Sequence, residues 1–186
     1  MKKLSYILSL IIIIVFVSPL FSKPKLLKSV GLAAGISMPQ NDWDLGYVIS
    51  GQTDFGEVLD YLFLSPYFSY SNAGKSVEIG SAAEDISLQY LTMGVKIVGY
   101  INSKPKGFYF GGSISYNYIS YESLLTGQLS NKADIDKNKT TKVGFTGLAG
   151  YLYPFKKFSI FIETDYMVIP GGFNNFLVFT GLNLNL

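Results

Sequence analysis

The end of the chain alternates between apolar and polar positions in the pattern of a β-strand. One face of residues 176–186 is apolar apart from a single threonine and contains Phe176, Val178, Thr180, Leu182, Leu184 and Leu186. The opposite face contains Gly181, Asn183 and Asn185, after Leu177 and Phe179. At the end of a soluble chain such a strand would leave an open sheet edge. In a transmembrane β-barrel the last strand pairs with the first, so no edge remains.

Similar alternation recurs along the chain in eight segments of roughly ten residues, the length that a tilted strand needs to cross a bilayer. The segments are 29–38, 46–56, 61–71, 85–100, 107–120, 141–153, 158–168 and 175–186. After residue 22 the sequence has no uninterrupted apolar run long enough for a helical span. An even number of strands lets neighbours alternate in direction and the sheet close. We therefore expect an all-β fold, an eight-stranded antiparallel up-and-down transmembrane barrel.

The segment 158–168 has the clearest alternation. Phe158, Ile160 and Ile162 share one face with Thr164, Tyr166 and Val168, whereas Glu163 and Asp165 share the other with Ser159, Phe161 and Met167. In a soluble barrel the apolar face would point inward. In a transmembrane barrel it contacts lipid, and the two carboxylates line the interior. The alternation alone does not decide between the two.

The lengths of the connections favour the membrane barrel. The connections after odd-numbered segments are 39–45, 72–84, 121–140 and 169–174, and those after even-numbered segments are 57–60, 101–106 and 154–157. The first set contains both long connections. Long outer loops and short periplasmic turns are the asymmetry that outer-membrane barrels have. Regions 72–84 and 121–140 are therefore expected to be outer loops.

Aromatic residues gather near both ends of the expected strands, as they do at the two membrane–water boundaries. The periplasmic group is Phe55, Tyr61, Phe63, Tyr100, Phe108, Phe110, Tyr151, Tyr153, Phe155 and Phe158. The outer group is Tyr47, Tyr67, Tyr70, Tyr116, Tyr118, Tyr121, Tyr166 and Phe176. We predict two aromatic belts.

Two segments contain irregularities. In 85–100 the apolar face (Leu91, Met93, Val95, Ile97) has the parity of Ser87 and Gln89, which look like interior residues. A β-bulge near Tyr90–Leu91 would reconcile the halves; the alternative is that the upper half stands above the bilayer. Pro66 has no N–H to donate to a neighbouring strand, which predicts a local defect in the third segment.

The first 22 residues have the layout of a secretory signal peptide. Lys2 and Lys3 precede an aliphatic run from Leu8 to Val17, and Pro19 and Ser22 follow. The run is shorter than the ~20 residues of a membrane-spanning helix, which disfavours the alternative of a retained anchor. We predict a signal peptide over 1–22 and a single barrel domain over 23–186.

Composition narrows the chemistry. Loss of Lys2 and Lys3 with the signal peptide leaves 13 basic residues against 13 acidic residues. All the basic residues are lysines, and they are scattered along the chain. No nucleic-acid partner is therefore expected. The sequence has no Cys and no His. It therefore lacks thiolate chemistry, the usual general base at neutral pH and the commonest metal ligand.

With these features the chain resembles the small outer-membrane β-barrel superfamily, which includes the opacity proteins, OmpX and the membrane domain of OmpA. The resemblance covers nearly all of 23–186 and is architectural, so it assigns no functional residue. It implies a bacterial outer membrane reached through the periplasm, membrane lipid and lipopolysaccharide as neighbours, and the barrel-assembly machinery as a partner during insertion. Many members end in an aromatic residue that this machinery reads. Leu186 departs from that pattern, which implies less efficient insertion.

The candidate site is a luminal charge cluster. Glu163 and Asp165 are expected to face the interior, and Lys96 lies at a similar height above the periplasmic rim. An eight-stranded barrel has room inside for little more than side chains, and buried charges need partners. We predict a structural cluster of Lys96 and Glu163, joined by Asp165, rather than a catalytic or ion-conducting one. Replacing Glu163 with Gln should weaken heat-resistant migration on a gel.

The remaining motifs do not indicate a metal site or a nucleotide-binding site. Asp134-Ile-Asp136-Lys-Asn138 begins like a calcium loop, but Lys139 replaces the required Gly and Phe145 the bidentate Glu. The glycines at 31 and 35 and at 107, 111 and 112 lack the context of a nucleotide-binding loop and instead suit a strongly curved barrel. No catalytic residue, metal site or cofactor is expected.

These observations predict a bacterial outer-membrane barrel, not an enzyme, with a structural or surface-interaction role through its outer loops. A small porin-like channel is the first alternative, although Phe161, Met167 and Phe179 are expected to point inward and obstruct it. A soluble, secreted, lipocalin-like barrel with an apolar ligand is the second. The ligand on the cell surface is not identified by any residue.

Overall fold

A computed structural model describes residues 27–59, 61–79, 82–102, 104–127 and 135–186. The expected signal peptide over 1–22 lies outside them. The described residues form nine strands and contain no helix able to cross a membrane. The strands are β1 (Ser29–Pro39), β2 (Gly46–Asp54), β3 (Glu57–Leu59), β4 (Leu62–Ile79), β5 (Ala82–Tyr100), β6 (Gly107–Gly127), β7 (Ile135–Pro154), β8 (Phe158–Val168) and β9 (Asn175–Asn185).

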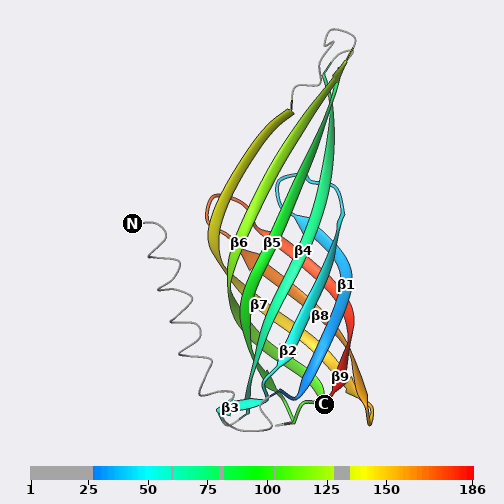
Figure 1. The fold of residues 1–186 in the computed structure, drawn as a ribbon, viewed down its shortest axis with the longest axis vertical. Coiled ribbons are helices and arrows are strands. Elements are labelled where there is room, and N and C mark those ends of the chain that lie inside the picture. The colour runs from blue at the N-terminus through cyan, green and yellow to red at the C-terminus, as the bar shows by residue number, and fades with distance from the viewer. Residues whose placement is uncertain (1–26, 60, 80–81, 103, 128–134) are drawn as a thin grey trace.

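Eight of these strands close into an antiparallel up-and-down barrel, as predicted (Figure 1). β1 pairs with β9 from Ser29↔Asn185 to Pro39↔Asn175, so the amphipathic last strand closes the sheet against the first. β2 pairs with β4, and the three-residue β3 pairs with β4 beyond the end of β2. The barrel has two ends. We call the end with connections 55–61, 101–106 and 155–157 the turn end, and the opposite end the hairpin end.

Side chains alternate across the barrel wall in the sense expected of a membrane protein. Large apolar residues are exposed on the outside, among them Leu32 (72 % exposed) and Ile114 (61 %), whereas Glu163 and Lys96 are buried in the interior. Ile160 and Ile162 are exposed on the same outer surface. A lipocalin-like barrel would bury these aliphatic residues instead. The outer surface therefore suits contact with hydrocarbon, as the outward face of a transmembrane barrel does.

The hairpin end differs from the expectation of long loops. The predicted loops 72–84 and 121–140 are wrong as loops, because most of their residues extend β4, β5, β6 and β7. These four strands have 18 to 21 residues, whereas β1, β2, β8 and β9 have 9 to 11. Figure 1 shows the long strands continuing past the rest of the barrel as one curved sheet. The two ends of the barrel do differ, as expected, but the difference lies in the length of the strands and not in the length of the loops.

The predicted bulge at Tyr90–Leu91 is also wrong. The pairings of β5 with β4 and with β6 keep one register along its whole length. Leu88 and Tyr90 therefore point inward and are buried, and Ser87 and Gln89 lie on the outer face. The outer face is polar there, because Ser87 and Gln89 of β5 and Glu122, which pairs with Ser87, are partly exposed on it. This agrees with the alternative, in which the upper half of the strand stands above the bilayer.

The defect expected at Pro66 is present on one side only. The β4–β5 ladder passes Pro66 without a break, whereas the β2–β4 ladder ends at Gln52↔Tyr67. Beyond it the backbone N–H of Phe55 donates to the carbonyl of Leu64, and that of Leu64 to the carbonyl of Gly56, which has φ +81°. Pro66 thus faces β2 at the point where regular pairing stops, as a residue without an N–H should.

Aromatic rings occupy the outer surface near both ends, with four exceptions. Among the expected belt residues, Phe63 is buried, Tyr67 and Tyr100 line the lumen, and Tyr121 packs against Trp43 with ring centroids 6.1 Å apart. At the turn end Phe108 contacts Tyr151 (4.9 Å) and Phe155 stacks on Phe158 (4.6 Å). These rings and the exposed aliphatic residues define an apolar band around the barrel.

Candidate functional site

The predicted luminal charges meet in the middle of the barrel. Lys96 belongs to β5, and Glu163 and Asp165 belong to β8, on the opposite side of the lumen. All three residues are at most 3 % exposed. Lys96 donates a hydrogen bond and forms an ion pair with Glu163 Oε1, and its Nζ lies 4.0 Å from Asp165 Oδ2. The structure therefore brings the three residues of the predicted cluster together from two distant strands.

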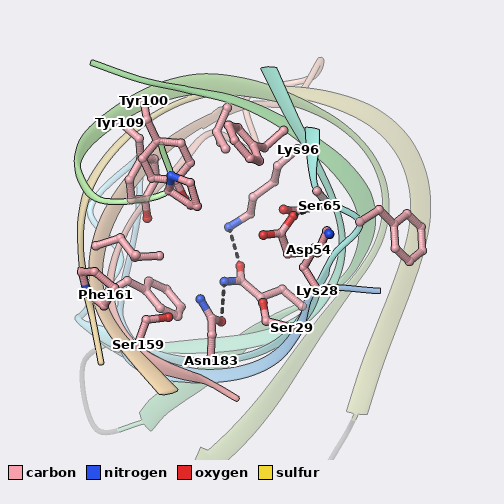
Figure 2. A pocket seen from close by; sticks show the side chains of 18 of the residues that line it. Lys28, Ser29, Asp54, Ser65, Lys96, Tyr100, Tyr109, Ser159, Phe161 and Asn183 are labelled. Carbon is pink, nitrogen blue, oxygen red and sulfur yellow. Dashed lines mark hydrogen bonds between the residues drawn. The ribbon is translucent and has the colours of Figure 1, made fainter. Parts of the chain in front are cut away.

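Uncharged side chains complete the cluster. The Tyr109 hydroxyl donates to Glu163 Oε2 over 2.9 Å. Lys96 Nζ also donates to Gln52 Oε1 at 3.5 Å, and Gln52 donates in turn to Asn183 Oδ1 at 3.2 Å, a chain of contacts drawn in Figure 2. Sequence reasoning missed Tyr109 and Gln52. Their inward parity was a signal, but their height relative to Glu163 depends on strand stagger.

Two aromatic rings flank the ammonium group of Lys96. Its Nζ lies 5.0 Å from the ring centroid of Tyr67 and 5.1 Å from that of Phe179. The negative faces of aromatic rings attract a cation, most strongly where water is excluded. Two rings, a carboxylate and an amide oxygen together replace the water that Lys96 loses on folding. The geometry holds the charge in place and leaves it no exposed reactive position.

The two carboxylates differ in how well they are satisfied. Glu163 accepts hydrogen bonds on both oxygens, whereas Asp165 Oδ1 is buried with no hydrogen-bond partner among the described residues. A buried polar atom without a partner is unfavourable. Asp165 borders a small cavity, together with Thr92 and Thr146, that has room for about one water molecule. The cluster therefore depends on Glu163 more than on Asp165.

This difference predicts unequal effects of neutral substitutions. Glu163→Gln should weaken the barrel by about 3 kcal/mol, because it leaves Lys96 without its close counter-ion. Asp165→Asn should have a much smaller effect, because it removes a charge that is incompletely paired. Heat-resistant migration on a gel and the melting temperature in detergent measure both. Equal losses of stability in the two variants would contradict the assignment of Glu163 as the main partner.

Below the cluster the lumen widens into a cavity of about 770 Å³, which we call the vestibule. Lys96 and Glu163 border it at depth, and Lys28, Glu57 and Lys104 border it at the turn end, where it opens. Its wall alternates apolar residues such as Phe161 and Tyr100 with polar residues such as Ser65, Ser159 and Asn183 (Figure 2). The vestibule is thus accessible from one end of the barrel.

Above the cluster the lumen is filled by an apolar plug. The plug consists of Leu88, Tyr90, Ile119, Met167 and Ile169, all buried, with Trp43 and Phe173 packed against them. The Tyr90 hydroxyl donates to the carbonyl of Phe173 in the connection between β8 and β9. Phe161, Met167 and Phe179 point inward, as predicted. No plug residue lines the vestibule, so among the described residues the plug lies beyond the charge cluster, toward the hairpin end.

The closed lumen predicts an electrically silent barrel. Purified protein in planar lipid bilayers should show no steady conductance, because an ion would have to cross the apolar plug without its hydration water. Single-channel recording at both polarities measures this directly. Reproducible unit conductance steps would contradict the plug and favour the porin-like alternative.

The described residues contain no group of three or more acidic side chains able to hold a metal ion. The sequence has no His or Cys to supply such ligands. The run 134–138, which begins like a calcium loop, starts outside the described residues. The carboxylates of Glu163 and Asp165 face Lys96, so they do not form an open pair of acid and base.

No protein-family model matches the chain, and no curated protein matches its sequence. Its fold is similar to that of Ail, the attachment invasion locus protein of Yersinia pestis. One Ail structure gives a TM-score of 0.59 at 11 % identity over 87 % of this chain and 99 % of that one. A second, in complex with the heparin analogue sucrose octasulfate, gives 0.57 at 12 % identity over 86 % of this chain and 98 % of that one. At these identities the likeness extends to the fold alone.

Proposed function

We propose that this chain is a bacterial outer-membrane barrel that presents a β-sheet at the cell surface for interaction with other molecules. The observation that carries the proposal is the extension of β4–β7 beyond the apolar band, with polar residues such as Asp85, Ser87 and Gln89 on its outer face. A barrel that only filled the membrane would not need this extension. The role is structural and binding, without enzymatic activity, and the signal peptide and the barrel-assembly machinery bring the chain to the membrane.

The orientation follows from the two ends of the barrel. The turn end lacks the strand extensions of the hairpin end and contains Leu186, and we assign it to the periplasm. The hairpin end faces the outside of the cell. Short periplasmic turns and longer outer segments are the rule for barrels in the outer membrane. The exposed aliphatic band between the two ends supports a location in lipid.

The charge of the hairpin end indicates the kind of partner. Among the described residues its sequence has the lysines Lys75, Lys137, Lys139 and Lys142 against the acids Asp42, Asp44, Glu78, Glu84, Asp85, Glu122 and Asp136. This surface is therefore unlike one built for a polyanion such as the heparin analogue bound to Ail. We propose a neutral or basic protein surface, on a host cell or in the envelope, as the main partner. We propose that Lys139 contacts lipopolysaccharide phosphates; its Nζ lies 6.0 Å from the centroid of the Tyr118 ring.

Location and orientation can be tested together because the chain has no cysteine. Asn138→Cys places a thiol at the hairpin end, and Lys156→Cys places one at the turn end; both positions are exposed. In intact cells a membrane-impermeant maleimide should label the first variant, and should label the second only after permeabilisation. The reverse pattern would invert the orientation. Recovery of the protein in the soluble fraction without detergent would remove the membrane location.

The binding role is tested by shortening the sheet. Two facing pairs, Gly74↔Ser87 and Glu122↔Lys137, permit cuts that remove 75–86 and 123–136 and close each hairpin with an Asn-Gly turn. The shortened chain keeps the plug and the charge cluster, so its heat-resistant migration should be unchanged. Bacteria carrying it should lose the adhesion to cultured host cells or to one another that the full chain confers. Equal adhesion by both chains would contradict the surface role.

A further inference from the structure

Positive charges are concentrated in one part of the turn end. The connections 101–106 and 155–157 contain Lys104, Lys106, Lys156 and Lys157 and no acidic residue. The two connections are neighbours, because β6 pairs with β7 from Gly107↔Leu152 onward. All four side chains are exposed. We call them the turn-end lysine patch.

The described acidic residues nearby form no ion pair with this patch. Asp54 and Glu57 lie in the β2–β4 part of the rim, and each accepts a hydrogen bond from its own neighbourhood: Asp54 from the backbone N–H of Gly56 at 2.7 Å, and Glu57 from that of Tyr61 at 2.7 Å. Within the described residues none of the four lysines forms an ion pair. Four positive charges thus remain available on one side of the rim.

Aromatic rings fix the height of the patch relative to the bilayer. Phe108, Tyr151, Tyr153, Phe155 and Phe158 surround the two connections, with ring contacts of 4.6 to 5.0 Å between three pairs. Rings of this kind lie at the level of lipid headgroups. Lys156 and Lys157 lie between Phe155 and Phe158 in the chain, and Lys106 and Lys104, the latter at the mouth of the vestibule, lie two and four residues before Phe108. Long lysine side chains at this height can place their ammonium groups in the layer of phosphate groups.

We propose that the turn-end lysine patch binds the headgroups of anionic phospholipids in the periplasmic leaflet. The proposal rests on the orientation given under Proposed function. Ammonium groups attract phosphodiester oxygens, and a lysine near an anionic membrane surface gains about 1 kcal/mol from that attraction. The acidic residues of the hairpin end make the opposite face unsuitable for the same lipid. The patch therefore gives the barrel a preference for a lipid on one side of the membrane only.

The test measures lipid preference at a chosen height on the barrel. Trp43→Phe removes the single tryptophan of the chain. Phe158→Trp then reports on lipid at the turn end, and Tyr116→Trp, a 59 % exposed position nearer the hairpin end, is the matched control. Quenching by brominated phosphatidylglycerol in competition with phosphatidylcholine gives the relative binding constant at each site. The fourfold substitution of the patch by glutamine supplies the second arm.

At the Phe158→Trp reporter we expect a clear preference for phosphatidylglycerol that weakens with salt. It should fall by about fivefold or more in the fourfold Gln variant, the change that corresponds to about 1 kcal/mol. The Tyr116→Trp reporter should show little preference and no change. A preference that is the same at both reporters, or that survives the fourfold substitution, would overturn this inference and leave the proposed function standing. If the chain with native lysines does not enter bilayers at all, both this inference and the proposed function fail.

Discussion

Replacing Lys96 with methionine should lower the free energy of unfolding by about 3–5 kcal/mol, the cost of breaking a buried ion pair by removing one partner. The substitution would leave Glu163 and Asp165 facing each other, both at most 3 % exposed, with no positive charge beside them. Gln52 and the rings of Tyr67 and Phe179 would also lose the cation that they surround. Urea unfolding of the detergent-solubilised or vesicle-inserted barrel measures the change, and heat-resistant migration on a gel gives a rapid readout.

Two controls separate the loss of charge pairing from the loss of packing. Lys156→Met removes an exposed lysine and should change stability by little. Lys96→Met combined with Glu163→Gln and Asp165→Asn leaves a neutral cluster of similar volume, and should recover a large part of the lost stability. If the triple variant were as unstable as Lys96→Met alone, the charge cluster would not be what Lys96 stabilises.

The charge cluster shows how much of the site could be predicted from the sequence alone. The period of two in 158–168 put Glu163 and Asp165 inside, and counting residues from the turn end put Lys96 at a similar height. That is sufficient at this height because long side chains from opposite walls reach each other across the lumen, as Lys96 and Glu163 do. Tyr109 and Gln52 come from two further strands. Their contact with the cluster depends on the stagger of each strand against the next, which side-chain parity does not record.

The extended sheet was missed for a different reason. Inside the membrane a strand is recognised by an apolar face. Above it both faces of β4–β7 meet water or each other, so residues 72–79, 82–87, 120–127 and 135–140 lose the alternation while their backbones continue to pair. The sequence therefore resembles a polar loop. The same loss of pattern suggested a bulge at Tyr90–Leu91, although Leu88 and Tyr90 keep one register and fill the lumen as part of the plug.

Glycines at the closing seam are expected to be nearly as sensitive as the charge cluster. Gly35 of β1 pairs with Phe179 of β9. A Cβ atom on Gly35 would lie 2.0 Å from the carbonyl oxygen of Val178 and 2.5 Å from the Cα of Phe179, both backbone atoms. Gly35→Ala should therefore lower the free energy of unfolding by about 3 kcal/mol, the upper end of overpacking effects. Because the seam joins the first and last strands, folding into lipid should slow as well.

Gly147→Ala provides the matched control for this prediction. Gly147 lies in β7, and a Cβ atom there would have no heavy atom within 4 Å. That substitution should be neutral or stabilise by about 0.4–1 kcal/mol, because alanine restricts the unfolded chain more than glycine does. Chemical unfolding and the rate of insertion into vesicles compare the two variants. If Gly35→Ala inserted and unfolded like Gly147→Ala, β1 and β9 would not approach each other as closely as the closed barrel requires, and the curvature attributed to its glycines would be wrong.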